Sequence, residues 1–196
     1  MTEQAKTRRI AVILAGGGGR RMGGADKGAL TLGGRRLFDH VHDRLAPQAD
    51  RVLISGSHDY GAGLPVFADR DDGPLGPAAG LWAALHWIDA HAPQTESFFS
   101  APVDGPFLPL DLVARLGGRK VSAIAADANG LHPAFGCWRV DALRAALSAA
   151  PDGYGLPMKK LAESIHAEHV MFDDPGAFEN INTSQDLARA EARLRA

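Results

Sequence analysis

The sequence predicts an α/β fold, a three-layer sandwich around a mostly parallel sheet. Short runs of branched apolar residues alternate with segments in which apolar residues recur at helical spacing, and this alternation is typical of such folds. The 196 residues are 45% apolar and 22% charged, as in ordinary globular domains. This length suits one compact unit, and no linker, low-complexity tract or internal repeat divides it. We therefore expect a single domain over residues 1–196.

The first half of the chain opens with its clearest strand. Residues 10–14 (IAVIL) form a continuous apolar run that glycines end, as expected for a strand buried on both faces of a parallel sheet. A helix is predicted over 36–45, because four apolar residues recur there at helical spacing: Leu37, Phe38, Val41 and Leu45. Gly33-Gly34 before it is interpreted as a plain turn into that helix. The other elements predicted here are strands at 52–54, 66–68 and 98–102 and a helix at 81–91.

The second half continues the alternation of helices and strands. A short helix at 110–116 is closed by Gly117-Gly118, and a strand at 121–125 is expected to pair with a strand at 131–138. Helices at 140–149 and 158–165 and a strand at 169–172 follow. The segment Thr183-Ser-Gln-Asp186 resembles a capping box and predicts the start of a terminal helix that runs towards Arg195.

Charge and cysteine content exclude several classes of protein. The net charge is −2 and no basic stripe is present, which argues against binding to nucleic acid. Cys137 is the only cysteine, so disulfide frameworks and cysteine-rich zinc sites are excluded. The N-terminus is polar and the apolar run after it is too short for a signal segment or a membrane span. We therefore expect a cytoplasmic protein that does not interact with membranes.

A glycine-rich loop follows the first strand. Nine of the 23 glycines fall between Gly16 and Gly34. Successive glycines let the backbone turn sharply and point several N–H groups at one place, where a polyphosphate can approach without meeting a Cβ. Arg20, Arg21 and Lys27 supply cations in the same loop. The alternative is a flexible surface connection with solvated charges, but open α/β sheets bind ligands at the carboxyl ends of their strands.

Two common phosphate-binding loops do not fit this segment. A Walker A loop needs G-x-x-x-x-G-K-[ST], whereas Lys27 follows Asp26 and precedes Gly28. No register of the glycines between 16 and 24 gives the dinucleotide fingerprint G-x-G-x-x-G. P-loop ATPases and Rossmann dehydrogenases are therefore disfavoured.

The loop, from Leu14-Ala15-Gly16-Gly17 through Arg20-Arg21-Met22-Gly23-Gly24 to Asp26-Lys27-Gly28, resembles the signature of nucleotidyltransferases that act on sugars and cofactors. Its fuller form is similar to that of the molybdenum cofactor guanylyltransferases, the MobA type. Four later blocks follow in the same order as in that family: Gly76-Pro-Ala-Ala-Gly80-Leu81, Pro102-Val-Asp104-Gly-Pro106, His132-Pro-Ala-Phe-Gly136-Cys-Trp138 and Asn180-Ile-Asn182-Thr183. The resemblance covers nearly the whole chain and implies the Rossmann-like fold of the nucleotide-diphospho-sugar transferase type.

The resemblance implies a reaction and a metal. GMP is transferred from GTP to the terminal phosphate of molybdopterin, with or without molybdenum, and pyrophosphate is released. Such a reaction depends on charge neutralisation and in-line positioning. Asp104, at the end of a buried strand, is then the expected Mg²⁺ ligand, and Lys27 and Arg21 would neutralise the β- and γ-phosphates. The structural alternatives are an Asp104 that caps the turn at Gly105-Pro106 and solvated cations at the other two positions.

Further nucleotide contacts follow from the same resemblance. They involve the loop residues Leu14, Ala15, Gly16 and Gly17 together with Lys27, Asp104, Ser55 and Asp69. A carboxylate at Asp69 can accept from guanine N1–H and N2–H₂ and so discriminate against adenine, although Asp71 or Asp72 competes for that role. Ser55 stands where the family often has Asn, which leaves a base or ribose contact in question; a hydroxyl still makes one hydrogen bond.

Four residues are expected on the side of the acceptor: Gly80, His132, Asn180 and Asn182. The two asparagines alternate, so both face the same way if the segment is extended. Asn182 precedes the terminal helix and could instead serve as its cap. His132 could equally be a hydrogen-bonded strand residue. One departure from the family pattern is visible, because Gly105 stands where the family often has Thr.

Two rival functions stay open from the sequence. One is a cytidylyltransferase that acts on the same pterin or on another phosphorylated small molecule, since the glycine loop serves both bases. The other is a catalytically inactive nucleotide-binding module, against which the retention of Lys27 and Asp104 argues. The resemblance also implies transient contact with other proteins of cofactor biosynthesis or with the recipient molybdoenzyme.

Overall fold

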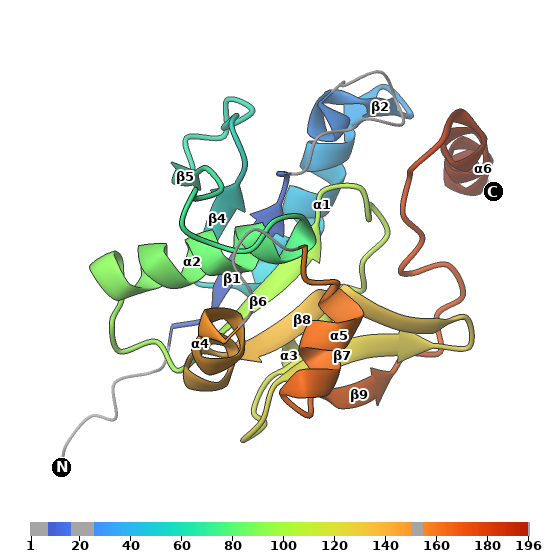
Figure 1. Cartoon of the computed structure of the whole chain (residues 1–196). Coiled ribbons are helices and arrows are strands. Elements are labelled where there is room, and N and C mark those ends of the chain that lie inside the picture. Colours follow the sequence, from blue (N-terminus) through green and yellow to red (C-terminus); the bar gives the residue numbers. More distant parts are fainter. Residues whose placement is uncertain (1–7, 17–25, 150–154, 196) are drawn as a thin grey trace, which may run out of the picture.

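The computed structural model describes residues 8–16, 26–149 and 155–195. Seven strands form one sheet in the order β5-β4-β1-β6-β8-β7-β9 (Figure 1). Their bounds are β5 Val66–Phe67, β4 Arg51–Ser55, β1 Ile10–Leu14, β6 Ser97–Pro102, β8 Gly130–Arg139, β7 Ala123–Asp127 and β9 Glu168–Met171. The first four are mutually parallel, β8 is antiparallel to both of its neighbours, and β9 is parallel to β7.

Helices cover both faces of this sheet. On one face lie α2 (Pro77–His91), α4 (Val140–Ser148) and α5 (Met158–Ser164), which are in front of the strands in Figure 1. On the other face lie α1 (Leu37–Leu45) and α3 (Leu112–Leu116). Alternate residues of β1 serve the two layers, because Ile10 and Val12 pack with the first group and Ala11 and Ile13 with the second. The predicted three-layer α/β sandwich is confirmed.

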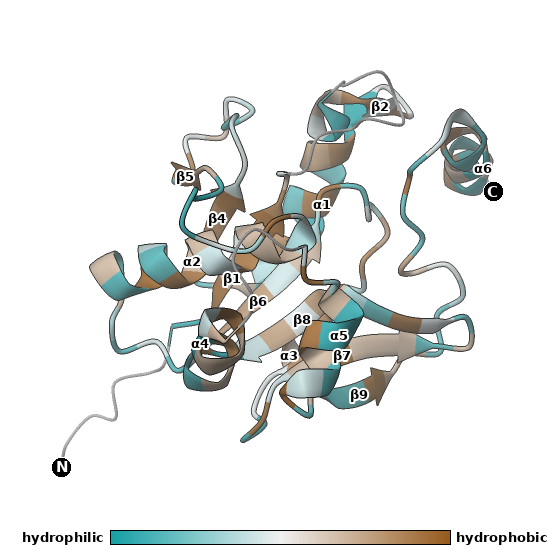
Figure 2. Cartoon of the chain, viewed as in Figure 1, coloured by the Kyte–Doolittle hydropathy of each residue, from teal (hydrophilic) through white to brown (hydrophobic). Residues whose placement is uncertain are grey.

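The hydropathy of the elements follows this burial. In Figure 2 the strands β1 and β4 are mostly brown, whereas α6 (Ser184–Arg195) is mostly teal. Ala190 is the buried residue of α6, which packs outside the sandwich on a small third cluster. That cluster comprises Leu32, Leu37, Phe107, Ile181 and Ala190. It ties the end of the chain to the segment that follows the glycine loop.

A small hairpin was not predicted. β2 (Thr31–Leu32) and β3 (Arg35–Arg36) pair antiparallel across Gly33 and Gly34, whose φ angles are +58° and +80°. Two consecutive positive φ angles are what a tight two-residue hairpin turn requires, and glycine adopts them without strain. Gly33-Gly34 is thus a turn, as predicted, but it closes a hairpin whose second strand precedes the helix at Leu37.

Two element boundaries differ from the predicted ones for local reasons. α2 begins at Pro77 and not at residue 81, because proline suits the first turn of a helix and Gly76 before it has a φ of +79°. β7 spans Ala123–Asp127 and not 121–125, since its register is set by pairing with β8, with an irregularity between Ile124 and Ala125. The predicted pairing of this strand with the segment at 131–138 is confirmed.

None of the described helices has both the length and the apolar character that a membrane crossing needs.

Candidate active site

The carboxyl ends of four parallel strands define the candidate active site. Phe67 of β5 pairs with Ser55 of β4, which pairs with Leu14 of β1, which pairs with Pro102 of β6. These four residues therefore form one row across the sheet. The loops that follow them leave the sheet at the same edge and carry Gly16, Asp69 and Asp104, so the topology itself gathers these predicted residues.

Lys27 connects distant parts of the chain at this edge. Its Nζ donates to Asp104 Oδ2 at 2.7 Å and to Asn182 Oδ1 at 2.6 Å. The side chains of Lys27 and Asp104 are 23% and 13% exposed, so the ion pair is largely shielded from water. Lys27 is therefore not a solvated surface charge. Asp104 does not serve mainly as a cap of the next turn either, because its carboxylate accepts from this lysine.

The two asparagines approach the turn at Asp104 from the segment before α6. Ile181 N donates to the backbone oxygen of Asp104 at 2.8 Å, which fixes the two segments side by side. Asn182 then reaches Lys27, and Asn180 Oδ1 lies 3.5 Å from the position of a Cβ built on Gly105. Both side chains thus face the same turn, as the alternation predicted.

The cap of α6 is provided by Thr183 and not by Asn182. Thr183 Oγ1 accepts from Asp186 N at 3.1 Å, and Asp186 Oδ2 accepts from Thr183 N at 2.8 Å and from Asn182 N at 2.9 Å. These bonds, led by the one from Asn182 N, hold the pKa of Asp186 below its ordinary value. The predicted capping box is confirmed, and it leaves the Asn182 side chain free of the helix end.

Asp69 faces the start of the glycine loop. Its Oδ1 would lie 3.3 Å from a Cβ on Gly16, so the carboxyl group and the loop backbone approach closely. Although Asp69 is exposed as a residue, partial burial of its carboxyl group raises the pKa. Asp72 is instead bonded to Arg70, which donates to it at 2.8 and 2.6 Å. These two bonds, and then one from the indole N–H of Trp82, lower the pKa of Asp72. Of these two carboxylates, Asp69 is thus the one placed beside the loop.

Ser55, Gly80 and Leu14 form a second contact group under α2. A Cβ on Gly80 would lie 2.7 Å from Ser55 Oγ and 3.1 Å from Leu14 Cδ2, so the helix packs closely on the ends of β4 and β1. Ser55 is fully buried, and its hydroxyl has no hydrogen-bond partner among the described residues. A contact from this hydroxyl to a nucleotide stays a prediction.

His132 lies on the other side of β6, at the start of β8. Its Nε2 is 2.8 Å from Asp127 Oδ1, and its ring stacks on Phe178 at a centroid distance of 4.9 Å. These contacts agree with the alternative given for His132 from the sequence, a hydrogen-bonded residue of a strand. We expected Gly80 and His132 together on the acceptor side, but the structure does not bring them together. Gly80 packs on Ser55 of β4 and His132 belongs to β8, and β1 and β6 lie between these two strands.

Packing explains why residue 105 is glycine, where the family often has threonine. A Cβ at this position would collide with the ring of Phe135, whose Cε1 would be only 3.0 Å away. Phe135 is buried and makes an edge contact with Phe178, so it cannot move aside easily. Glycine is therefore required here, and a threonine does not fit this core.

Sequence reasoning assigned no role to two carboxylates that contact predicted site residues or their turns. Asp26 accepts from Gly28 N at 2.9 Å and caps the short 3-10 turn Lys27–Ala29. The pattern Asp-x-Gly is a known turn signal and could have revealed it. Asp127 is buried beneath His132; burial alone would raise its pKa, but the bonds from His132 and Asn129 outweigh this and lower it. No local pattern marks that pair.

Two predicted site residues, Gly17 and Arg21, lie outside the described residues. Within the described part of the chain, no group of three or more His, Cys, Asp or Glu residues could hold a metal ion. A magnesium ion at Asp104 would therefore need further ligands beyond such a cluster of described side chains, such as phosphate oxygens and water. Asn182, next to it, offers an amide oxygen.

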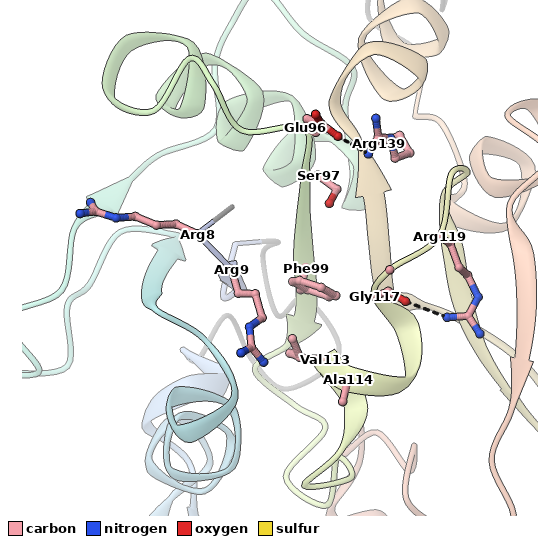
Figure 3. Close-up of a pocket in the computed structure, with 11 residues that line it drawn as sticks. Arg8, Arg9, Glu96, Ser97, Phe99, Val113, Ala114, Gly117, Arg119 and Arg139 are labelled. Carbon is pink, nitrogen blue, oxygen red and sulfur yellow. Dashed lines mark hydrogen bonds and ion pairs between the residues drawn. The ribbon is translucent and has the colours of Figure 1, made fainter. Parts of the chain in front are cut away.

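A pocket of about 480 Å³ lies at the opposite, amino edge of β1 and β6 (Figure 3). Its arginines do not converge on a common point. Arg139 pairs with Glu96 at 3.1 Å, Arg119 pairs with Glu168 at 2.9 Å, and Arg8 points away from the cavity. This pocket is therefore not the candidate site.

Comparison with known proteins agrees with this geometry. Residues 11–169 match the family model of the MobA-like NTP transferase domain. A molybdenum cofactor guanylyltransferase from Cereibacter sphaeroides is 43% identical over 194 residues, covering 96% of this chain and 98% of that protein. One from Rhodopseudomonas palustris is 42% identical, covering 92% and 91%.

Solved structures show the same fold at lower identity. Molybdopterin-guanine dinucleotide biosynthesis protein A from Archaeoglobus fulgidus superposes with a TM-score of 0.69 at 21% identity, covering 95% of this chain and 98% of that one. The 2-C-methyl-D-erythritol 4-phosphate cytidylyltransferase from Thermus thermophilus gives 0.66 at 18% identity, covering 96% and 100%. At such identities these structures show the fold alone, whereas the curated relatives and the family model show the family. The chain belongs to the molybdenum cofactor guanylyltransferases, with a MobA-like NTP transferase domain.

Proposed function

We propose that the chain transfers GMP from GTP to the terminal phosphate of molybdopterin and releases pyrophosphate. The observation that carries this proposal is the contact of Lys27 with Asp104 and Asn182 at the carboxyl edge of the parallel strands. It places a cation, a carboxylate and an amide where an open α/β sheet binds its ligand. The curated relatives are named molybdenum cofactor guanylyltransferases, and this name supports guanylyl transfer to that cofactor.

In this reaction an oxygen of the acceptor phosphate attacks the α-phosphorus of GTP. The bond between that phosphorus and the oxygen bridging to the β-phosphate breaks, and the electron pair leaves with pyrophosphate. Negative charge therefore grows on the β- and γ-phosphates, and a fixed cation beside them stabilises the transition state. We assign that role to Lys27, together with the predicted Arg21 of the glycine loop.

The residues at Asp104 fit a magnesium ion. Mg²⁺ prefers oxygen ligands and usually takes one or two protein carboxylates, with phosphate oxygens and water completing its shell. Asp104 supplies the carboxylate and Asn182 an amide oxygen, and both already contact one cation, the Lys27 ammonium. When bound, the ion would neutralise phosphate charge and hold the α-phosphate in line. Lys27, Asp104 and Asn182 would then orient the two substrates towards each other.

Recognition of guanine is assigned to Asp69. Its carboxylate lies beside Gly16 and can accept from both N1–H and N2–H₂ of a guanine, whereas adenine offers no such pair of donors. The raised pKa of Asp69 results from burial and marks a carboxylate that a pair of donors would stabilise. The Gly16 backbone has no Cβ, which leaves the approach to this carboxylate open.

The test is a direct assay of product formation. The chain is incubated with molybdopterin, Mg²⁺ and one of GTP, CTP or ATP, and the dinucleotide product and pyrophosphate are quantified. We expect product from GTP alone and its loss when EDTA removes the metal. A preference for CTP would contradict the substrate assignment and leave the reaction type intact. GTP binding without any product would instead favour the inactive nucleotide-binding module.

A further inference from the structure

The phenol of Tyr60 lies against the turn that carries Lys27. A Cβ on Gly28 would collide with the Tyr60 hydroxyl and would lie 2.5 Å from Cζ of the ring. Gly28 is buried, so the turn Lys27–Ala29 and the ring are in contact without space between them. The glycine after Lys27 is therefore needed for this approach.

One carboxylate joins the two elements. Asp26 Oδ1 accepts from Gly28 N at 2.9 Å and from the Tyr60 hydroxyl at 2.8 Å. Lys27 stands between the two residues that share these bonds, so its backbone is fixed on both sides. Burial, and then the bond to Asp26, raise the pKa of Tyr60. The phenol therefore keeps its proton at neutral pH and donates the hydrogen bond to Asp26.

Tyr60 is itself anchored to the core. Its ring stacks on buried Phe38 of α1 at a centroid distance of 4.4 Å and an interplanar angle of 19°. Its backbone oxygen accepts from Arg36 Nη1 at 2.8 Å, and Arg36 is held by two bonds to Asp39 at 2.8 and 2.7 Å. The ring is therefore a rigid support for the turn.

Lysine has a long and flexible side chain, and its ordering has an entropic cost. Lys27 nevertheless meets two partners that are 77 and 155 positions away in the sequence. A turn that is fixed before the contact forms lowers that cost, because fewer torsions remain to be ordered. The chain of contacts from Phe38 through Tyr60 and Asp26 supplies this fixation.

We propose that Tyr60 is a positioning residue that acts through Asp26 to direct Lys27 at the phosphates. The inference rests on the proposed function, since it gives Lys27 a phosphate ligand. Tyr60 itself touches neither Asp104 nor Asn182 in the described hydrogen bonds, so its effect passes through the lysine.

The decisive experiment is a double-mutant cycle on GTP affinity, measured by calorimetry in the presence of Mg²⁺ for wild type, Y60F, K27A and Y60F/K27A. Y60F removes the hydroxyl and keeps the ring on Phe38, so the fold is preserved. We expect Y60F to weaken GTP binding about 5- to 10-fold, which is within the net value of a typical protein hydrogen bond. In the K27A background the same change is expected to cost less than about 2-fold. An equal loss in both backgrounds would overturn the proposal.

A second measurement does not depend on GTP. The chain has five lysines, so NMR of isotope-labelled lysine side chains is tractable, with K27R identifying the Lys27 signal. We expect a distinct signal for Lys27 in wild type that moves towards the solvated lysines in Y60F. S164A is the matched control, since it deletes a hydroxyl bonded to Leu161 O on α5, and it should leave the signal in place. A Y60F signal identical to that of S164A would overturn the positioning role. Failure of wild type to bind GTP would instead count against the proposed function.

Discussion

The two halves of the candidate site are held in place by different means. On the proposed nucleotide side, backbone topology sets the geometry, because the row of strand ends at Phe67, Ser55, Leu14 and Pro102 brings the loops to one edge. Around His132, which the sequence predicted on the acceptor side, side-chain packing sets the geometry. There His132 is stacked on Phe178, which also contacts Phe135 and Phe172.

This difference shows where polar groups are available to a ligand. Asp69 and Asp104 lie on loops and are held by few bonds, so their carboxylates can change partners when a ligand arrives. Asp127 is buried beneath His132 and bonded to Asn129 as well, so that pair is committed to the fold. Substitutions on the two sides should therefore have different signatures, with loss of function on the first and loss of stability on the second.

The largest effect is expected for D104N. Asparagine keeps the size of the side chain but removes the charge that Lys27 and a magnesium ion need, so turnover should fall by about 10³-fold while GTP binding is largely kept. Steady-state kinetics and calorimetry separate the two quantities. D89N, on an exposed pair with Arg144, is the control. Unchanged turnover would remove Asp104 from the mechanism.

D69N should have the next largest effect, on base selection. An amide accepts through one atom only, so we expect GTP affinity to fall by about 10- to 100-fold with little change for ITP, which lacks the 2-amino group. Titration of GTP and of ITP against wild type and D69N measures the two changes in affinity. An equal loss for the two nucleotides would show that Asp69 does not contact that amino group.

The same residue gives a pH dependence with a defined sign. Only the ionised carboxylate accepts from both guanine donors at once, so GTP affinity falls as pH falls through the pKa of Asp69. Because burial raises that pKa above the ordinary 3.8, the decline begins at a higher pH than for an unperturbed carboxyl group. D69N should lack this part of the pH dependence. The difference between the pH profiles of wild type and D69N therefore separates the titration of Asp69 from that of GTP itself.

On the acceptor side, H132A should act on stability. It leaves the Asp127 carboxylate buried without its main partner and removes the stack on Phe178, so we expect a loss of about 1–3 kcal/mol in the free energy of unfolding. Asp127 has a lowered pKa, so the stabilisation that it gives is present at neutral pH and is lost as pH falls through that pKa. Denaturant unfolding at pH 7 measures the change, with H91A as control.

GTP affinity should stay unchanged in H132A. A clear loss of GTP binding at full stability would break the division between the two halves.

The smallest effect is expected for S55A. The buried hydroxyl has no partner among the described residues, so its removal should change the stability of the free protein by less than about 1 kcal/mol, in either direction. If Ser55 bonds the nucleotide, GTP affinity falls a few-fold in the same variant. Thermal unfolding of wild type and S55A, with and without GTP, shows whether the Ser55 hydroxyl contributes to the fold or bonds the nucleotide.

The sequence predicted most strands and helices because their apolar periodicity is local. It did not reveal the hairpin that Gly33-Gly34 closes, which depends on two positive φ angles, or the bounds of β7, which depend on cross-strand register. For the site, the motif order identified Lys27, Asp104 and Asn182 as candidates. It could not show that they touch, since no periodicity relates positions so far apart.

The same limit explains the residues that were missed or misplaced. The pairing of His132 with Asp127 depends on the bend of a hairpin and on an aromatic ring from a later segment. The position of Gly80 depends on how closely α2 packs on β4. The need for glycine at position 105 arises from a single ring, Phe135, thirty positions later.

The separation of Lys27 and Asn182 by 155 positions has a consequence for how the chain becomes active. Contacts between such distant positions close a long loop and form late in folding. The first strands and Asp104 can assemble while the segment before α6 is still being synthesised, but the lysine then lacks one of its two partners. The full set of Lys27 contacts therefore reports complete folding, and an intermediate with a formed sheet and an undocked α6 should be less active than the folded chain.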